Sequence, residues 1–144
     1  GVDALASIDL GDWGRKPWGD TYFGFTPPRL AAPADTIVLM TGHDAVAYMI
    51  PFFPPQVRFL RIQGYVTGPS DTPNETDRLM RRAIEAHRGP LYILYRVYEK
   101  WHAEMALADY RLRLDPATCV TFVPEVEPQQ EHDFYFCSVN KLKQ

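Results

Sequence analysis

The stretch Thr36–Gly64, TIVLMTGHDAVAYMIPFFPPQVRFLRIQG, decides the expected fold because it joins two strand-like runs through a short helical segment. The first run, Thr36–Met40, is apolar and partly β-branched, which is typical of a buried strand. A short helix is expected over Ala45–Ile50, and Pro51 ends it because proline lacks an amide donor. The second run, Val57–Ile62, is the next strand. This stretch therefore predicts one β-α-β unit.

A capping box gives the best local signal in the chain and predicts the start of a second helix. Thr72 can accept hydrogen bonds from the amides of the first turn, Pro73 suits the first helical position, and Glu75 completes the box. Gly89 and Pro90 supply the stop at the other end. The apolar stripe of this helix, at helical spacing, comprises Leu79, Met80, Ala83, Ile84 and His87.

A third strand and a third helix are expected next. The run Leu91–Val97 is apolar and aromatic, as in a strand. Apolar residues then recur at intervals of three and four, which predicts an amphipathic helix. The residues of this stripe are Tyr98, Trp101, Met105, Ala108 and Leu112.

The chain is expected to close with a β-hairpin. Two strand-like runs, Cys119–Val123 and Phe134–Val139, flank the polar loop Glu125–Asp133. The order β-α-β-α-β-α followed by two strands predicts an α/β protein with three layers, in which a mainly parallel sheet carries the hairpin as an antiparallel edge. Residues 1–35 are predicted to be an irregular, aromatic and Pro-rich lead-in arm packed on a single domain, 36–144. Alternatively, the aromatic residues of this arm form an exposed contact surface.

Composition places the chain among ordinary globular proteins, with 46% hydrophobic and 23% charged residues in 144. A net charge of −3 gives no reason to expect binding to nucleic acid or to an anionic membrane. No window offers about 18 uninterrupted apolar residues, so no membrane span is expected. No signal peptide is evident, and the opening Gly-Val-Asp suggests a piece cut from a larger protein.

Candidate site residues follow from the expected sheet, because ligands of parallel sheets bind beyond the carboxyl ends of the strands. The catalytic candidates are His43, Asp44, Arg96 and Glu99. The candidates for a ligand groove are Gly42, Gln63, Tyr65 and Tyr98. His43 could act as a general base near neutral pH, with Asp44 orienting it. The simpler interpretation is favoured, in which Gly42 permits a turn, Asp44 caps a helix, and His43 is an exposed loop residue.

No metal and no cofactor are expected. The four histidines, His43, His87, His102 and His132, are far apart and lie in no recognised metal-ligand spacing. The glycine-rich fingerprints of nucleotide-binding loops are missing from the sequence. His87, near a helix end, is more simply explained by a favourable interaction with the helix dipole.

The two cysteines stand on opposite arms of the expected hairpin. Cys119 and Cys137 are 18 positions apart, so their sulfurs can meet if the arms pair. A disulfide closing a loop of that size would contribute about 3 kcal/mol and would imply an oxidising compartment. The alternative is a pair of buried free cysteines in a cytosolic protein.

Several phrases resemble a known class of proteins. They are DWGRKPWGDTYFGFTPP (12–28), the stretch 36–64 quoted above, HRGPLYILYR (87–96), and DPATCVTFVPEV with FYFCSVNK (115–126 and 134–141). Together they are similar to the soluble C-terminal portion of bacterial polytopic membrane proteins of the glycosyltransferase-like C-type class. The resemblance covers most of the chain and rests on aromatic, Pro and Cys patterning.

This resemblance implies a periplasmic domain, tethered to the inner membrane by the transmembrane portion of the same parent chain. In that class, lipid-linked sugars are used at the outer face of the membrane, and the catalytic acidic residues typically lie in loops between membrane helices. No catalytic motif of the class falls on a residue of this chain. The resemblance also favours the disulfide between Cys119 and Cys137.

The leading functional hypothesis is a non-catalytic extracytoplasmic domain that covers the membrane active site or binds the acceptor, a glycan or lipid-linked sugar, or a partner. A second hypothesis is a small stand-alone α/β enzyme in which His43, Asp44, Arg96 and Glu99 converge at the carboxyl ends of the strands as base, orienter and anion clamp. A third is a protein-interaction module that uses the aromatic arm.

Overall fold

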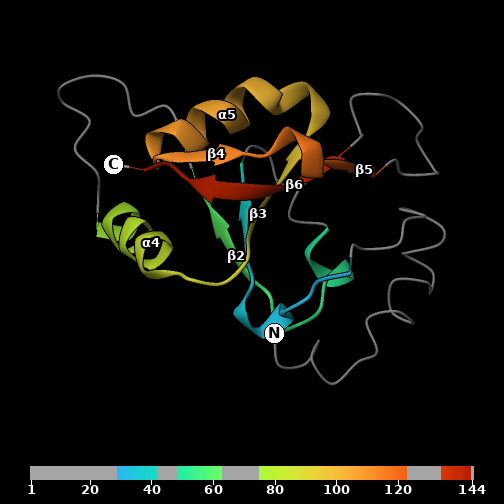
Figure 1. The fold of residues 1–144 in the computed structure, drawn as a ribbon, viewed down its shortest axis with the longest axis horizontal. Helices are drawn as coiled ribbons and strands as arrows, with labels where there is room; N and C mark the ends of the chain where they lie inside the picture. Colours follow the sequence, from blue (N-terminus) through green and yellow to red (C-terminus); the bar gives the residue numbers. More distant parts are fainter. Residues whose placement is uncertain (1–28, 42–48, 63–74, 123–133, 144) are drawn as a thin grey trace.

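The computed structural model describes residues 29–41, 49–62, 75–122 and 134–143. These residues form a six-stranded sheet with two α-helices and several 3-10 turns (Figure 1). The strands are β1 (Ile37–Met40), β2 (Arg58–Arg61), β3 (Leu91–Arg96), β4 (Leu112–Leu114), β5 (Val120–Phe122) and β6 (Phe134–Lys141). The helices are α4 (Glu75–Ala86) and α5 (Lys100–Asp109). The 3-10 turns are η2 (Pro33–Asp35), η3 (Ile50–Phe52), η4 (Val97–Glu99) and η5 (Pro116–Thr118).

The sheet has the order β2-β1-β3-β6-β4, and β5 also pairs with β6. β1 pairs in parallel with both β2 and β3, so the expected parallel part is confirmed. The other three pairings, β6 with β3, β4 and β5, are antiparallel, so the sheet as a whole is mixed. The C-terminal hairpin is confirmed by the β5–β6 pair.

Hydrophobic clusters cover both faces of this sheet, because neighbouring strand residues point to opposite sides. In β1, Ile37 and Leu39 belong to one cluster and Val38 and Met40 to the other. The first cluster includes residues from α4 and α5, namely Ile84, Ala103, Ala106 and Leu107. The second cluster includes Met49, Phe53 and Val57, which lie on either side of η3, and Leu30, which precedes η2. β1 is fully covered on both sides, which explains its near-continuous apolar sequence.

The prediction for the third helix was wrong at its C-terminal end. α5 ends at Asp109, and Leu112 lies in β4, a strand that was not expected. The change occurs at Arg111, which has a φ of 59° and so turns the chain out of the helix. Leu112 and Leu114 are buried on either side of the exposed Arg113, which is the alternation of a strand.

The apolar stripe predicted for this helix was expected to face the sheet but faces mainly outward. Tyr98 is 51% exposed and Trp101 63% exposed, whereas Ala103, Ala106 and Leu107 are buried against the sheet. Small alanine side chains let α5 approach the sheet closely, while the larger rings remain outside. Periodicity alone could not distinguish the two faces, since α5 carries apolar residues on both.

The short helix expected over Ala45–Ile50 falls partly outside the described residues, which resume at position 49. The part that is described is not α-helical there, because Ile50–Phe52 form a 3-10 turn that contains Pro51 in its first two positions. Phe53 follows in extended conformation and is buried in the second cluster. Here the proline lies inside a 3-10 turn, whereas it was expected to end an α-helix.

The described part of α4 runs from Glu75 to Ala86, so the helix ends before Gly89 as expected, while the predicted capping residues Thr72 and Pro73 lie outside the described residues. Within its predicted stripe, Ile84 and His87 are buried, but Leu79 is 54% exposed. Among the described residues, no helix is long and apolar enough to cross a membrane.

Candidate functional site

The chain leaves two neighbouring parallel strands toward opposite faces of the sheet. After β1 it returns through η3, where Phe53 packs with Val38 on one face. After β3 it runs through η4 into α5, where Leu107 packs with Ile93 on the other face. In open parallel sheets, ligands bind beyond the carboxyl ends of the strands at such a switch. The candidate site is therefore the edge at which β1 and β3 end.

Thr41 stands at this edge, directly after β1. It lies one position beyond the Met40–Leu94 pair of the β1–β3 register. Thr41 is 3% exposed, and its Oγ1 has no hydrogen-bond partner among the described residues. Leaving a buried hydroxyl without a hydrogen bond costs about 1–3 kcal/mol of folding free energy, so its presence at this position needs an explanation. A hydroxyl can both donate and accept, which suits a polar ligand at this edge.

The three described candidates from the sequence lie together at the end of β3. The guanidinium of Arg96 lies over the ring of Tyr98, 4.6 Å from its centroid. Glu99 ends η4 and precedes α5, and it is 3% exposed. A carboxylate there is favoured by the positive end of the helix dipole. Arg96 and Tyr98 thus face outward as a pair, while Glu99 is built into the start of the helix.

The remaining candidates from the sequence cannot be placed against this edge. His43, Asp44, Gly42, Gln63 and Tyr65 all lie outside the described residues. Within the described ranges, no group of three or more His, Cys, Asp or Glu side chains could hold a metal ion. The described part of the edge offers one hydroxyl, one arginine–tyrosine pair and one buried carboxylate. That set can bind hydroxyl or anionic groups.

His87 has a structural role in the described fold. It is 7% exposed, and its Nε2 lies 3.0 Å from the carbonyl oxygen of Pro90. A carbonyl can only accept, so Nε2 donates this bond, and Nδ1 faces the Arg58 guanidinium at 3.5 Å. His87 therefore joins the end of α4 to the start of β3 and to β2.

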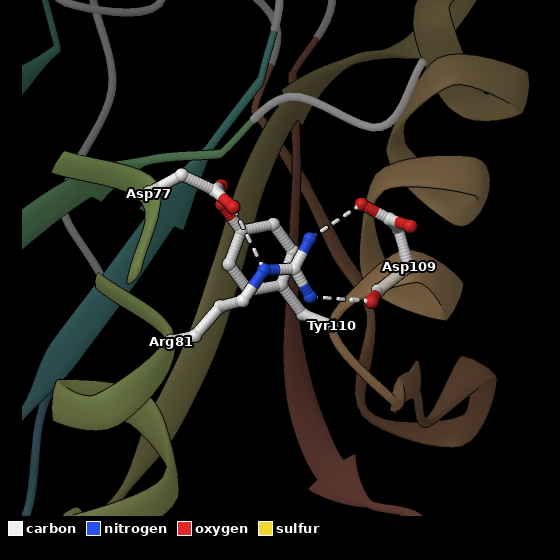
Figure 2. Close-up of polar contacts among 4 residues, drawn as sticks. All are labelled: Asp77, Arg81, Asp109 and Tyr110. Atoms are coloured by element: carbon white, nitrogen blue, oxygen red, sulfur yellow. Dashed lines mark hydrogen bonds and ion pairs between the residues drawn. The ribbon is translucent and has the colours of Figure 1, made fainter. Parts of the chain in front are cut away.

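A second polar cluster, away from the strand ends, ties α4 to the end of α5 (Figure 2). Arg81 donates from Nε to Asp77 Oδ2, and from its two terminal nitrogens to the backbone carbonyl and Oδ2 of Asp109, each at 2.8 Å. The Tyr110 hydroxyl donates to Asp77 Oδ1 at 2.5 Å. The guanidinium also lies 4.2 Å from the centroid of the Tyr110 ring.

The pKa directions in this cluster match its geometry. Partial burial alone would raise the pKa of Asp77, but the hydrogen bonds from Tyr110 and Arg81 and the Arg81 charge outweigh it and lower the pKa. Burial, and then the hydrogen bond to the Asp77 carboxylate, raises the pKa of Tyr110. The cluster is thus held as an ionised carboxylate, a guanidinium and a neutral phenol, which is the state of a structural clamp.

The expected disulfide is present between Cys119 and Cys137, with their Cα atoms 4.2 Å apart. Val120 pairs with Phe136, so the two cysteines face each other one position before β5 begins. Cys137 is fully buried in the first hydrophobic cluster, and its Sγ lies 4.0 Å from the Tyr95 hydroxyl. The bond thus fixes the register of the hairpin at the sheet.

Comparison with known proteins gives no match to a family model, a curated protein or a solved structure. The function must therefore be inferred from the chain itself.

The sequence reasoning missed Thr41 and the Asp77–Arg81–Asp109–Tyr110 cluster. The only local signal for Thr41 was its place directly after a buried apolar run, where a polar residue ends a strand. The four clustered residues are separated by as many as 33 positions, as between Asp77 and Tyr110. Only the tertiary fold, which brings α4 to the end of α5, places them together.

Proposed function

We propose that this chain is a non-catalytic extracytoplasmic domain of a membrane-embedded glycosyltransferase-like protein. Its partner would be the transmembrane portion of the same parent chain. Its task would be to cover the membrane active site, or to bind the acceptor, a glycan or lipid-linked sugar, or a partner protein. The sequence resemblance supports this proposal, and the Cys119–Cys137 disulfide is the observation that carries it.

The disulfide bears on the compartment because such bonds persist where the environment is oxidising. In the cytosol, thioredoxin and glutathione keep thiols reduced. A periplasmic location outside the inner membrane accords with an oxidised pair. The buried position of Cys137 also makes the bond part of the fold, since its sulfur lies within the first hydrophobic cluster.

The non-catalytic assignment is supported by the positions of two of the catalytic candidates, Glu99 and Arg96. Glu99 is buried at the start of α5, and the guanidinium of Arg96 lies over Tyr98. Both positions have a structural explanation at the junction of β3 and α5. The position of His43 and Asp44 as a turn and a helix cap remains a prediction.

The finer parts of the predicted architecture also belong to this proposal. They are the three layers and the division into an arm, 1–35, and a domain, 36–144. Leu30 packs in the second hydrophobic cluster, and Asp35 lies against Gly89. These two contacts support an arm whose last residues are packed on the domain.

The test of the compartment measures the thiol state in cells that make the protein from its own gene. The cells are quenched with acid, and a mass-adding maleimide is applied to the denatured protein before and after reduction. We expect a mass shift only after reduction. A double variant, Cys119→Ala with Cys137→Ala, provides the control without thiols. Two free thiols in freshly quenched cells would contradict the proposal.

The non-catalytic assignment has its own test in the full natural chain. Combined His43→Ala and Asp44→Asn substitutions, and separately Arg96→Gln, should leave sugar transfer from a lipid-linked donor largely intact in isolated membranes. Urea unfolding of each variant shows whether the fold is kept. Complete loss of transfer with an unchanged unfolding midpoint would indicate that this domain takes part in the chemistry.

The second candidate function is a small stand-alone α/β enzyme with its site at the carboxyl ends of the strands. The observation in its favour is Thr41, whose buried Oγ1 has no partner among the described residues at the switch between β1 and β3. A Thr41→Val substitution keeps the shape and removes the hydroxyl. Loss of a measured activity in this variant, with stability unchanged or raised, would favour the enzyme.

A further inference from the structure

Helix α5 carries apolar residues on both of its sides, although only one side packs on the sheet. Ala103, Ala106 and Leu107 are buried in the first hydrophobic cluster. On the outer side, Trp101 is 63% exposed, and Tyr98, in the turn that leads into the helix, is 51% exposed. Apolar helix faces are normally covered, and exposed apolar patches mark sites of interaction. The outer side of α5 is therefore a candidate contact surface.

An apolar groove continues this surface toward β4, which lies beside α5 (Figure 1). The groove has a volume of about 580 Å³. Glu104 and Ala108 line it, and their helical spacing from Trp101 places them on the same side of α5 as that ring. Its other apolar walls are Leu107, Leu112, Leu114, Pro116 and Leu142. Leu142 is 43% exposed. We call the two rings, the groove and Leu142 together the α5 surface.

The charged residues that border the α5 surface are mainly basic. Arg113 lines the groove itself. The Arg111 carbonyl accepts a hydrogen bond from the Leu142 amide at 2.9 Å, and Lys143 follows Leu142 in the chain. These three basic residues are exposed, and none of them forms an ion pair with another described residue. Because the whole chain has a net charge of −3, this positive charge is a local feature of the surface.

The acidic groups nearby do not balance this charge. Glu104 lies 3.8 Å from the ammonium group of Lys100. Asp109 accepts a hydrogen bond from Arg81 at 2.8 Å. Asp115 caps η5 and carries a single negative charge against the three basic residues. The α5 surface is therefore apolar at its centre and positive along its border, which complements a partner that is apolar inside and anionic outside.

The residue types of the α5 surface are those found at membrane interfaces. Trp and Tyr combine an apolar ring with a polar N–H or O–H, and they concentrate where hydrocarbon meets the lipid headgroups. Lys and Arg cover apolar surface with their stems while their charged ends reach lipid phosphates. Protein–protein interfaces, in contrast, are depleted in lysine, whereas Lys100 and Lys143 both flank this surface.

We propose that the α5 surface rests on an anionic phospholipid bilayer, with the axis of α5 parallel to the membrane plane. The rings of Tyr98 and Trp101 enter the boundary between headgroups and acyl chains, as in helices that lie on membranes. Leu142 and the groove contact the apolar part of the lipid, and the three basic side chains contact phosphates. The inference rests on the proposed function, in which a tether holds the domain at the inner membrane, and it names the surface that faces the lipid.

The test measures how the intact chain partitions onto unilamellar vesicles, by sedimentation. One set of vesicles consists of phosphatidylglycerol and phosphatidylcholine in equal parts, and the other of phosphatidylcholine alone. We expect saturable binding to the first set and weaker binding to the second, because attraction to anionic headgroups adds to the burial of apolar surface. Added salt should weaken binding to the first set, since it screens exposed charges.

The contribution of the rings is measured with Tyr98→Ala combined with Trp101→Ala. This variant should lower the partition constant by about tenfold or more, because both interfacial rings are lost. The matched control is Leu79→Ala, since Leu79 is 54% exposed but lies in α4. It should change the partition constant by less than about twofold, because it removes no apolar area from the α5 surface.

The contribution of the basic border is measured with Arg113→Gln combined with Lys143→Gln. Binding to the anionic vesicles should fall about tenfold or more, because each basic residue near the surface adds to the attraction. The matched control, Arg29→Gln with Arg78→Gln, removes the same charge at exposed positions elsewhere and should change binding less than about twofold. All these side chains are exposed, so the urea unfolding midpoints of the variants should equal that of the unchanged chain.

A fluorescent label identifies the surface that touches the lipid. The two native cysteines are joined in a disulfide, so an introduced cysteine is the one free thiol. An NBD label on Ala108→Cys should brighten and shift to shorter wavelength when anionic vesicles are added. The same label on Ala34→Cys, at an exposed position of η2 on the opposite side of the molecule from α5 (Figure 1), should not change.

The proposal is overturned if the chain does not partition onto the anionic vesicles, if a control variant weakens binding as much as the variant it matches, or if the label at position 34 responds as strongly as the label at position 108. Vesicle binding is measured without the parent protein and without a sugar. Its failure is therefore distinct from failure of the proposed compartment, which is read from the thiol state in cells.

Discussion

The hydroxyl of Tyr110 donates a 2.5 Å hydrogen bond to the carboxylate of Asp77, and so joins the end of α5 to the first turn of α4. The same carboxylate accepts from Arg81, which reaches on to Asp109 (Figure 2). The side chains of Arg81 and Asp77 are 27% and 16% exposed, so water screens this pair only in part. The cluster therefore has measurable consequences for stability.

Tyr110→Phe should destabilise the protein by about 1.5–3 kcal/mol, because it removes a hydrogen bond to a charged group and keeps the ring. The free energy of unfolding in urea measures this change. Tyr98→Phe is the matched control: Tyr98 is 51% exposed, and its substitution should change stability by less than about 0.5 kcal/mol. Equal effects of the two substitutions would show that the Tyr110 hydrogen bond contributes nothing.

Acid should remove the contribution of Asp77. Its folded pKa lies below the ordinary value of 3.8, so its contribution is complete above that pH and is lost as pH falls through the folded pKa. Asp77→Asn should be less stable than the wild-type chain near neutral pH, but should lose less stability between about pH 4 and pH 2. Urea unfolding at several pH values checks this. Parallel curves for the two proteins over that range would be the contrary outcome.

Alkali should destabilise the fold through two tyrosines. Burial raises the pKa of Tyr95 to about 12, with smaller contributions from Tyr135 and Glu104. Burial and the bond to Asp77 also raise the pKa of Tyr110. Both phenols favour the folded state while they are neutral. Their contribution to the free energy of unfolding is therefore complete below the unfolded pKa of 10 and is lost as the pH rises above it. Absorbance of tyrosinate during alkaline unfolding should show their ionisation only with unfolding, and Tyr110→Phe should make the loss shallower.

Reduction of the disulfide should lower the free energy of unfolding by about 3 kcal/mol, the loop-entropy value for a bond that spans 18 positions. Urea unfolding with and without a phosphine reductant measures it. The Cys119→Ala, Cys137→Ala double variant should be insensitive to the reductant. An identical midpoint for the reduced and oxidised wild-type chains would contradict the prediction.

Gly89→Ala should destabilise the protein by about 1–3 kcal/mol, because a Cβ there would overlap both the backbone oxygen and the carboxylate of Asp35. Removing that carboxylate with Asp35→Gly should relieve only part of the overlap, since the backbone oxygen stays. The thermal midpoints of the two single variants and the double variant measure this. Full rescue by Asp35→Gly would show that only the side chain obstructs the Cβ.

Local signals were sufficient for much of the parallel half of the fold. A buried strand at β1 follows from a continuous apolar run of neighbouring residues. The capping box at the start of α4 stays a prediction, because Thr72 and Pro73 lie outside the described residues. The disulfide could also be predicted from the sequence, because two cysteines on opposite arms of a short hairpin can meet when the arms pair.

The orientation of α5 could not be predicted from the sequence. Tyr98 and Trp101 form a better apolar stripe than Ala103 and Ala106, yet the alanines face the sheet. Close packing favours the small side chains where a helix lies directly on strands. The end of the helix was missed for a related reason: Arg111 takes a positive φ that no sequence rule required of an arginine.

The sequence by itself determined which segments become the parallel strands, since these depend on the pattern of neighbouring residues. Only the tertiary structure decided the place of β4 at the side of the sheet, the outward face of α5, the buried Thr41 hydroxyl, and the meeting of Asp77 with Tyr110. These features arise from contacts between segments distant in the chain, whose geometry is set by packing and by the hydrogen bonds that packing permits.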